Sequence, residues 1–284
     1  MASCRSLGKE LKRVRLHTEN NDFQYAETLK RNRNKRHKFG EFLVEGVRNI
    51  NQAVEHAWPI RAFYSPADKP LSDWAKAIVE RAHPETHFLL PLALMEKLSD
   101  KEQTSELVAL AAMQPDDLAR IRPGAGGRTL VLDRPGNPGN LGTVLRSADA
   151  FRVDGVIVTG HAVDLYDPQV VRASVGSFFS VPVVRLPSHH ELVPWVERLR
   201  AEPEGLRVVG TSAKATTELR DASFDGRSLI VLGNETSGLS AAYLAMCDEV
   251  VTIPMAGTAT SLNVSCAASI VLYEAYLRSK ERGS

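Results

Sequence analysis

From residue 129 onward the chain alternates short apolar runs with segments of helical spacing, and this alternation constrains the fold more than any other feature. Continuous apolar runs separated by helices are typical of a parallel sheet whose two faces are both covered. The predicted strands are residues 129–133, 155–159, 181–185, 206–211, 228–233 and 249–253. The predicted helices are residues 140–151, 168–175, 189–201, 240–247 and 261–279. We therefore predict an α/β domain with a parallel sheet.

The first half of the chain has a different texture and predicts a second, smaller α/β unit. Strands are expected at residues 39–46, 60–64, 87–90 and 106–113, and helices at 47–56, 73–81 and 92–98. A polar segment rich in Pro and Gly separates the two halves and is typical of a linker. The predicted organisation is a basic N-terminal extension (residues 1–22), a small domain (23–114), a linker (115–128) and the parallel-sheet domain (129–284).

Composition excludes several classes of protein. With 43% hydrophobic and 24% charged residues, the 284-residue chain can bury a sizeable core, so wholesale disorder is excluded. The three cysteines, Cys4, Cys247 and Cys266, are far apart and form no metal-ligand pattern, so they are interpreted as reduced thiols. No apolar run is long enough to span a membrane and no signal peptide is apparent, so a cytoplasmic protein is expected.

Charge is unevenly distributed. The net charge is only +1, yet residues 1–48 hold 12 Lys and Arg against 6 Asp and Glu, a local net of +6. Six cations fall within residues 30–38, namely Lys30, Arg31, Arg33, Lys35, Arg36 and Lys38. Interleaved with Asn and His, they form a candidate surface for a polyanion such as RNA. From charge alone, a solvated basic face at a helix end is an equally good interpretation.

Familiar nucleotide and hydrolase motifs are absent. The sequence contains no G-x-G-x-x-G after the first strand of the sheet, no phosphate-binding G-x-x-x-x-G-K-[ST] and no G-x-S-x-G. His189, His190 and Glu191 form the only dense metal-like cluster, but they lack a third separated ligand and are interpreted as a helix start. No metal site is predicted. Dehydrogenase, nucleoside triphosphatase, hydrolase and zinc-enzyme functions are therefore disfavoured.

Three loops at predicted strand ends carry unusual residues. Ligands of open parallel sheets bind at the carboxyl ends of the strands. The first loop leads into a helix with Asn140, interpreted structurally as a helix cap, and Arg146, whose guanidinium would be costly unpaired on an apolar helix. The second is a sharp turn at residues 233–238 that carries Glu235. The third passes from Pro254 to Ser261, a plausible helix cap, and on to Asn263.

Together these loops resemble the three signature motifs of the SpoU (TrmH-type) branch of the SPOUT superfamily, which are RNA ribose 2′-O-methyltransferases. The first motif is carried by Asn140, Gly142 and Arg146, the second by Gly233, Glu235 and Gly238, and the third by Ile253, Pro254, Met255, Ser261, Leu262 and Asn263. The basic run together with Gly-Glu-Phe-Leu-Val-Glu-Gly at residues 40–46 resembles the start of the L30e-like RNA-binding domain found in many members. Within the family, the arrangement is most similar to the avilamycin-resistance 23S rRNA methyltransferase type.

The resemblance implies a catalytic domain with a trefoil knot, S-adenosylmethionine as cofactor and a homodimer acting on RNA. It implies cofactor contacts at Thr211, Gly233, Asn234, Ile253, Met255 and Leu262. It also implies that RNA contacts the six cations of residues 30–38. The implied substrate is structured RNA, with rRNA favoured over tRNA.

The resemblance further implies that Arg146, Asn140, Glu235, Ser261 and Asn263 are catalytic. Family proposals make the arginine the general base, but a guanidinium is a poor proton acceptor near neutral pH. We therefore expect Arg146 to grip the phosphate beside the target ribose. Asn140, Ser261 and Asn263 are expected to orient the hydroxyl, the cofactor or Arg146, and Glu235 to fix Arg146 or a loop.

The sequence leaves two other functions open. One is an RNA-binding protein that kept the fold and lost catalysis, against which the intact motif residues argue. The other is methyl transfer to a base atom or a protein, for which no sequence feature speaks. Whether the role is housekeeping or antibiotic resistance is not decided by the sequence.

Overall fold

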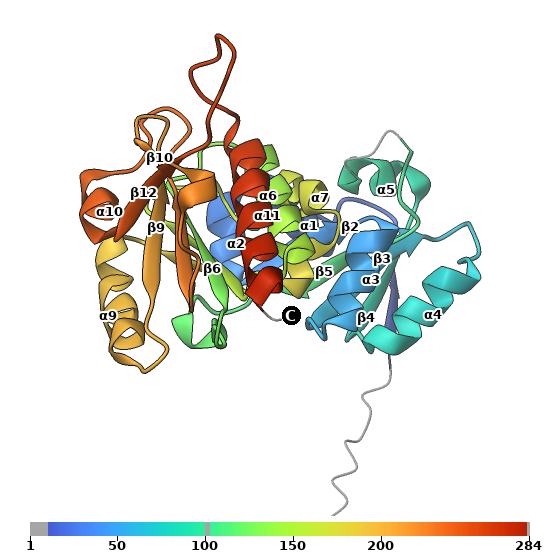
Figure 1. Ribbon diagram of the computed structural model, residues 1–284. Helices are drawn as coiled ribbons and strands as arrows, with labels where there is room; N and C mark the ends of the chain where they lie inside the picture. Colours follow the sequence, from blue (N-terminus) through green and yellow to red (C-terminus); the bar gives the residue numbers. More distant parts are fainter. Residues whose placement is uncertain (1–10, 100–102, 283–284) are drawn as a thin grey trace, which may run out of the picture. The chain divides into compact units, whose positions relative to one another are not determined.

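The computed structural model describes residues 11–99 and 103–282 and divides the chain into two compact units (Figure 1). The first unit extends to Met113 and includes Tyr166–Pro168, and the second comprises Gln114–Leu165 and Gln169–Ser284. No helix among the described residues is long and apolar enough to cross a membrane. Within the same residues, no group of three or more His, Cys, Asp and Glu side chains is placed to hold a metal ion.

A five-stranded mixed sheet, in the order β1-β4-β3-β5-β2, forms the first unit. β1, β4 and β3 are parallel, whereas β5 runs antiparallel to both β3 and β2. The strands are β1 (Lys12–Arg15), β2 (Glu41–Glu45), β3 (Ile60–Pro66), β4 (Thr86–Leu90) and β5 (Val108–Ala112). The helices are α1 (Asn21–Arg31), α2 (Arg33–Phe39), α3 (Val47–Glu55), α4 (Asp73–Ala82) and α5 (Leu92–Leu98).

The sequence did not predict β1, α1 or α2. Residues 11–22 were expected to belong to an extension, but they contribute β1, which pairs with β4. Asn20 and Asn32 cap α1 and α2 by accepting hydrogen bonds from main-chain N–H groups three residues ahead. Phe23 and Leu29 of α1 are fully buried in the core of this unit. The basic segment is therefore two capped helices.

Seven parallel strands form the sheet of the second unit, in the order β10-β12-β9-β11-β6-β7-β8. They are β6 (Arg128–Asp133), β7 (Gly155–Thr159), β8 (Val183–Leu186), β9 (Arg207–Thr211), β10 (Thr217–Glu218), β11 (Ser228–Leu232) and β12 (Glu249–Thr252). The prediction of a parallel sheet is confirmed. The short β10 was not predicted, and the predicted knot is not tested by the strand order and stays a prediction.

Helices separate these strands along the chain. They are α6 (Pro138–Ala150), α7 (Pro168–Ser174), α8 (Ser177–Ser180), α9 (Val193–Ala201), α10 (Ala241–Met246) and α11 (Val264–Arg282), with short 3-10 turns η1 (Leu118–Arg120), η2 (His189–Glu191) and η3 (Leu219–Asp221). α11 packs beside α6, where the hydroxyls of Ser147 and Ser269 lie 2.7 Å apart (Figure 1). The buried Arg128 side chain donates to the carbonyl of Ala275 and to Ser279, which ties α11 to the start of β6.

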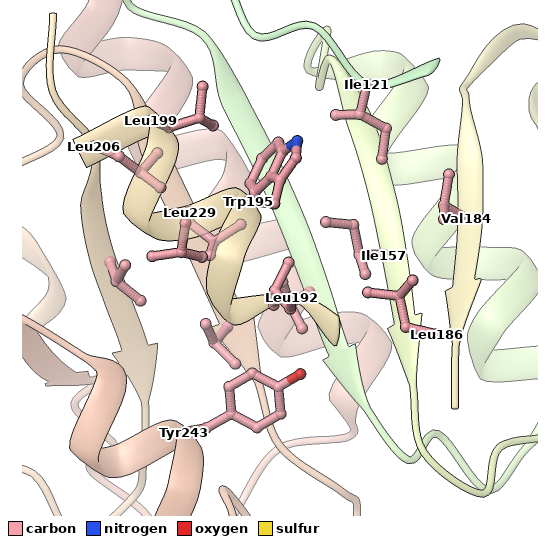
Figure 2. Close-up of a cluster of buried hydrophobic side chains, with 14 residues drawn as sticks. Ile121, Ile157, Val184, Leu186, Leu192, Trp195, Leu199, Leu206, Leu229 and Tyr243 are labelled. Carbon is pink, nitrogen blue, oxygen red and sulfur yellow. The ribbon is translucent and has the colours of Figure 1, made fainter. Parts of the chain in front are cut away.

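The core beneath α9 shows that the expected linker belongs to the second unit. Ile121, within the predicted 115–128 linker, is buried and joins a cluster with Trp195, Ile157 and Leu229 (Figure 2). Figure 2 shows Trp195, Leu192 and Leu199 clustered with side chains of the strands. The Pro and Gly content of residues 115–128 predicted a linker, but the buried Ile121 joins this segment to the core of the second unit.

Candidate active site

β6 and β11 are hydrogen-bonded neighbours in the parallel sheet, so the loops that follow them start side by side. After β6, the side chain of Asn137 accepts from the main-chain N–H of Asn140 and caps α6, whose first residue is Pro138. Asn140 is therefore not the helix cap that its residue type also indicated. It lies in the first turn of α6, and its side-chain amide makes its hydrogen bonds outside the helix.

A chain of hydrogen bonds joins the three motifs through Asn140. The Nδ2 of Asn140 donates to Oε1 of Glu235 at 3.3 Å, and its Oδ1 accepts from Nδ2 of Asn263 at 3.0 Å. The second carboxylate oxygen of Glu235 accepts from the main-chain N–H of Gly136 at 3.0 Å. Glu235, Asn140 and Asn263, which are far apart in the sequence, therefore form one connected polar cluster at the carboxyl edge of the sheet.

Asn263 also determines where α11 begins. Its Oδ1 accepts hydrogen bonds from the main-chain N–H and the hydroxyl of Ser265, at 2.8 and 2.6 Å. The helix consequently starts at Val264, and the expectation that Ser261 would cap it is wrong. Ser261 is exposed and lies outside the helix, and it makes no hydrogen bond with any residue that the structure describes.

The turn at residues 233–238, which we call the 233–238 turn, is held by its own backbone. Main-chain hydrogen bonds join Asn234 and Gly238 in both directions, at 3.0 and 2.9 Å. The Asn234 side chain accepts from the N–H groups of Thr236 and Ser237 and donates to the carbonyl of Arg134 at 2.7 Å. A Cβ added to Gly233 would lie 2.2 Å from the carbonyl carbon of Gly238. Asn234, expected at the cofactor, is thus engaged in shaping this turn.

Asp133 and Arg134 support the site from the end of β6, and the sequence interpretation did not single them out. Arg134 has a φ of 53°, a conformation that costs a non-Gly residue energy and that clusters at functional sites. Its guanidinium donates twice to the buried Asp133 carboxylate, which also accepts from the N–H of Ser240. The hydrogen bonds to Asp133 raise the pKa of Arg134 further. An acidic residue at the end of a buried apolar strand was the available signal.

Tyr243 closes the same edge of the sheet from α10. Its hydroxyl lies 2.8 Å from the hydroxyl of Thr159 at the end of β7. Burial is the main cause that raises the pKa of Tyr243 to about 12. The phenol is therefore protonated throughout the physiological range and acts here as a hydrogen-bonding group.

Arg146 is not hydrogen-bonded to the polar cluster of Glu235, Asn140 and Asn263. It is exposed on α6 and makes neither an ion pair nor a hydrogen bond with any described residue. The sequence indicated a guanidinium that is costly to leave unpaired, whereas the structure leaves it in contact with solvent. Glu235 was expected to fix either Arg146 or a loop, and its hydrogen bonds go to Asn140 and to the main-chain N–H of Gly136 in the loop after β6. Gly142, by contrast, lets α6 pack closely on α7.

The segment between β12 and α11 at residues 254–262, which we call the 254–262 loop, is exposed along its whole length. It is the red loop that extends from the sheet and from α11 at the top of Figure 1. Its main chain makes no hydrogen bond to any other described residue. Met255 and Leu262, both expected at the cofactor, are 36% and 39% exposed, and Ile253 lies at its base. Thr211 lies at the end of β9, where its hydroxyl donates to the carbonyl of Val231.

The six cations of residues 30–38 do not share one surface. The Arg36 side chain is only 3% exposed, donates to the carbonyls of Leu29 and Lys30, and pairs with Asp167. Its predicted contact with RNA is therefore wrong, because it packs inside the first unit. Lys30 donates to the carbonyls of Lys97 and Ser99. Arg31 pairs with Glu27 on α1, while Arg33, Lys35 and Lys38 are exposed.

Comparison with known proteins decides the family. Residues 127–273 match the SpoU rRNA Methylase family, and residues 20–109 match the SpoU L30e-like domain. The chain belongs to the SpoU rRNA methylase family. Its fold is therefore the α/β SpoU domain preceded by an L30e-like domain, as the sequence motifs predicted.

Members of the SpoU family are similar to this chain over most of its length. The 23S rRNA (uridine(2479)-2′-O)-methyltransferase of Streptomyces viridochromogenes is 45% identical over 92% of this chain and 91% of its own length. The crystal structure of AviRb from the same organism, in complex with AdoMet, has a TM-score of 0.86 at 44% identity, covering 92% of this chain and 98% of that one. The Bacillus subtilis 23S rRNA (guanosine(2553)-2′-O)-methyltransferase RlmP is 27% identical over 84% of this chain and 89% of its own length.

Proposed function

We propose that this chain transfers the methyl group of S-adenosylmethionine to a ribose 2′-hydroxyl of 23S rRNA. The observation that carries the proposal is the hydrogen-bonded cluster of Glu235, Asn140 and Asn263, which assembles one residue from each signature motif. The similarity of nearly the whole chain to a 23S rRNA 2′-O-methyltransferase supports the same reaction and the same class of RNA.

The residues around the 254–262 loop suit a nucleoside cofactor. The free main-chain N–H and C=O groups of this loop can pair with the edge of an adenine, and Met255 and Leu262 offer exposed apolar contact to its ring. The 233–238 turn, Thr211 and Ile253 border the same edge of the sheet. When bound, S-adenosylmethionine supplies an electrophilic methyl group on its sulfonium.

The protein's own contribution is to position the ribose and to manage its proton. Asn140 has both ends of its amide fixed, so the cluster can present donors and acceptors in a set geometry. Arg146 is free to bind a phosphate oxygen in a charge-assisted pair beside the target ribose. Its guanidinium stays protonated near neutral pH, so it acts as an electrostatic grip and the proton leaves to another acceptor.

Arg146 gives a direct test of this division of roles. We expect Arg146→Ala to lower kcat/KM by about 100-fold or more, since misplacement of a reactant by an ångström costs that much. Arg146→Lys, which keeps a point charge for the phosphate, should retain more activity than Arg146→Ala. An unchanged rate for Arg146→Ala contradicts the role as a grip.

We further propose that the chain works as a homodimer in the cytoplasm. Ile270 and Tyr273 on α11 are 40% and 50% exposed, which is unusual for large apolar side chains on neighbouring turns of one helix. A second copy packed on this face would cover them. Sedimentation of the purified chain should give twice the monomer mass, and a monomer at micromolar concentration contradicts this part of the proposal.

The activity is tested by incubating the chain with total RNA and S-adenosylmethionine labelled in its methyl group. Labelled 23S rRNA should contain an alkali-resistant linkage, because a 2′-O-methyl group blocks cleavage at that position. Firm cofactor binding without RNA labelling points to another methyl acceptor and contradicts the proposal. Absence of both would make the chain an RNA-binding protein without catalysis.

A further inference from the structure

An exposed aromatic ring on the first unit stands apart from the rest of the basic segment. Phe39 is the last residue of α2 and is 43% exposed. Two ammonium groups lie over its ring, with Nζ of Lys35 at 6.0 Å and Nζ of Lys38 at 5.9 Å from the centroid. Neither lysine forms an ion pair within residues 11–99 and 103–282.

The ring of Phe39 packs against the ring of Tyr25 in α1. The two ring centroids are 5.0 Å apart at an interplanar angle of 58°. The Tyr25 hydroxyl donates to Oε2 of Glu41 at 2.7 Å, so the supporting ring is pinned at its far end. Burial and this hydrogen bond raise the pKa of Tyr25, which keeps the hydroxyl a donor. Phe39 is therefore a supported ring that remains open to solvent.

We propose that Phe39 is a stacking platform for one unpaired base of the RNA substrate, with Lys35 and Lys38 binding the phosphates on either side of it. Single-stranded RNA is recognised mainly by stacking of splayed bases on aromatic side chains, combined with cations that follow the backbone. This arrangement holds both parts within one turn and a half of α2. A base inside a duplex has no free face, so the platform selects a loop, a bulge or an end.

The buried and exposed cations of α2 support this assignment. Arg36 is turned inward and paired, so it cannot serve RNA. Lys35 and Lys38 are exposed beside the aromatic ring, and α2 carries no acidic residue that would oppose a phosphate. An apolar surface for a protein partner would need more than one large exposed side chain here. Charge and shape therefore favour RNA over a protein.

The inference rests on the proposed function, because it assigns a contact to the RNA that the enzyme modifies. The test uses the full chain with an unstructured RNA of about 12 nucleotides, a length within the range of single-strand binding sites. A duplex RNA of equal length serves as the second probe. Methylation of protein-free 23S rRNA by the unaltered chain is measured in parallel, and its absence would overturn the proposed function independently of the platform.

Phe39→Leu should weaken binding of the single strand by about 5- to 100-fold, the range measured for loss of one base–aromatic stack. The affinity of Phe39→Leu for the duplex should equal that of the unaltered chain. Phe39→Trp, which keeps an aromatic ring, should bind the single strand about as tightly as the unaltered chain. The matched control is Val47→Ala, which shortens another exposed apolar side chain of the same unit, 53% exposed, and should leave both affinities unchanged. Lys35→Gln and Lys38→Gln should each reduce the slope of log affinity against log salt by about 0.7.

Three outcomes overturn the platform. Phe39→Leu could bind the single strand as tightly as the unaltered chain, which would leave the ring to a protein contact. It could weaken single strand and duplex equally, which would indicate general damage to the basic surface. Phe39→Trp could fail to restore binding, which would show that the ring does not act by stacking.

Discussion

The 233–238 turn and the 254–262 loop lie at the same edge of one sheet, but they are built in opposite ways. The turn is closed by two main-chain hydrogen bonds and by five that involve the Asn234 side chain, one of which it accepts from the hydroxyl of Ser237. The loop is fully exposed and its main chain makes no hydrogen bond within the described residues. The fold itself therefore fixes the 233–238 turn, whereas the main-chain polar groups of the 254–262 loop are available to a ligand.

Two glycines test this contrast with the largest expected effect. A Cβ at Gly233 would overlap the backbone of Gly238, whereas one at Gly257 meets nothing within 4 Å. Gly233→Ala should therefore disrupt the turn that carries Glu235, with a loss of activity of more than about 100-fold and a loss of stability of about 1–3 kcal/mol. Gly257→Ala should change the free energy of unfolding by less than about 0.5 kcal/mol. Thermal unfolding and methylation rates measure both. Equal losses of stability and activity in the two variants would contradict the contrast between the 233–238 turn and the 254–262 loop.

Binding of the cofactor should change the loop more than the turn. With S-adenosylmethionine at 100 times its Kd, amides that become protected only in the complex should exchange about 100-fold more slowly. We expect this slowing for residues 255–262 and a smaller change in the turn, measured by hydrogen exchange and mass spectrometry. The peptide containing β7 serves as the internal control. Exchange in the loop that stays fast while the cofactor is bound would place the cofactor elsewhere.

Glu235 gives a smaller, more local test of the fixed half. Its two carboxylate oxygens accept from Gly136 N–H and from Asn140, and a glutamine keeps only one acceptor. Losing a hydrogen bond to a charged group costs about 1.5–3 kcal/mol, so Glu235→Gln should lower kcat by about 10-fold or more. Glu197→Gln, on the exposed surface of α9, is the control and should be silent. A fully active Glu235→Gln variant would mean that this carboxylate does not support the site.

The sequence predicted the parts of this site better than their connections. The motif pattern pointed to Asn140, Glu235 and Asn263, and the sheet order brings their loops to one edge. It left open whether Glu235 holds Arg146 or a loop, and the structure places Glu235 against Asn140 and the loop residue Gly136. Which side chains meet at a loop depends on turn geometry that residue types do not encode.

Helix positions were harder to predict where neighbouring residues are chemically alike. Ser261 and Asn263 are both good caps, and only the path of the 254–262 loop selects the second. The basic run likewise conceals a buried Arg36, because charge alone does not show which face of α2 turns inward. Ile121 illustrates the reverse case, since this apolar residue of a Pro- and Gly-rich stretch is buried in the core of the second unit and Leu118 packs against the same cluster.

The central claim is that Asn140 couples the three motifs, and a double-mutant cycle of Asn140→Ala and Asn263→Ala on kcat/KM tests it most directly. The two side chains share a 3.0 Å hydrogen bond, and residues in direct contact show coupling of about 0.5–3 kcal/mol. We predict that the kcat/KM of the double variant is about equal to that of the less active single variant. Losses that multiply independently, as expected for the control pair Asn140→Ala with Glu197→Gln, would contradict the account.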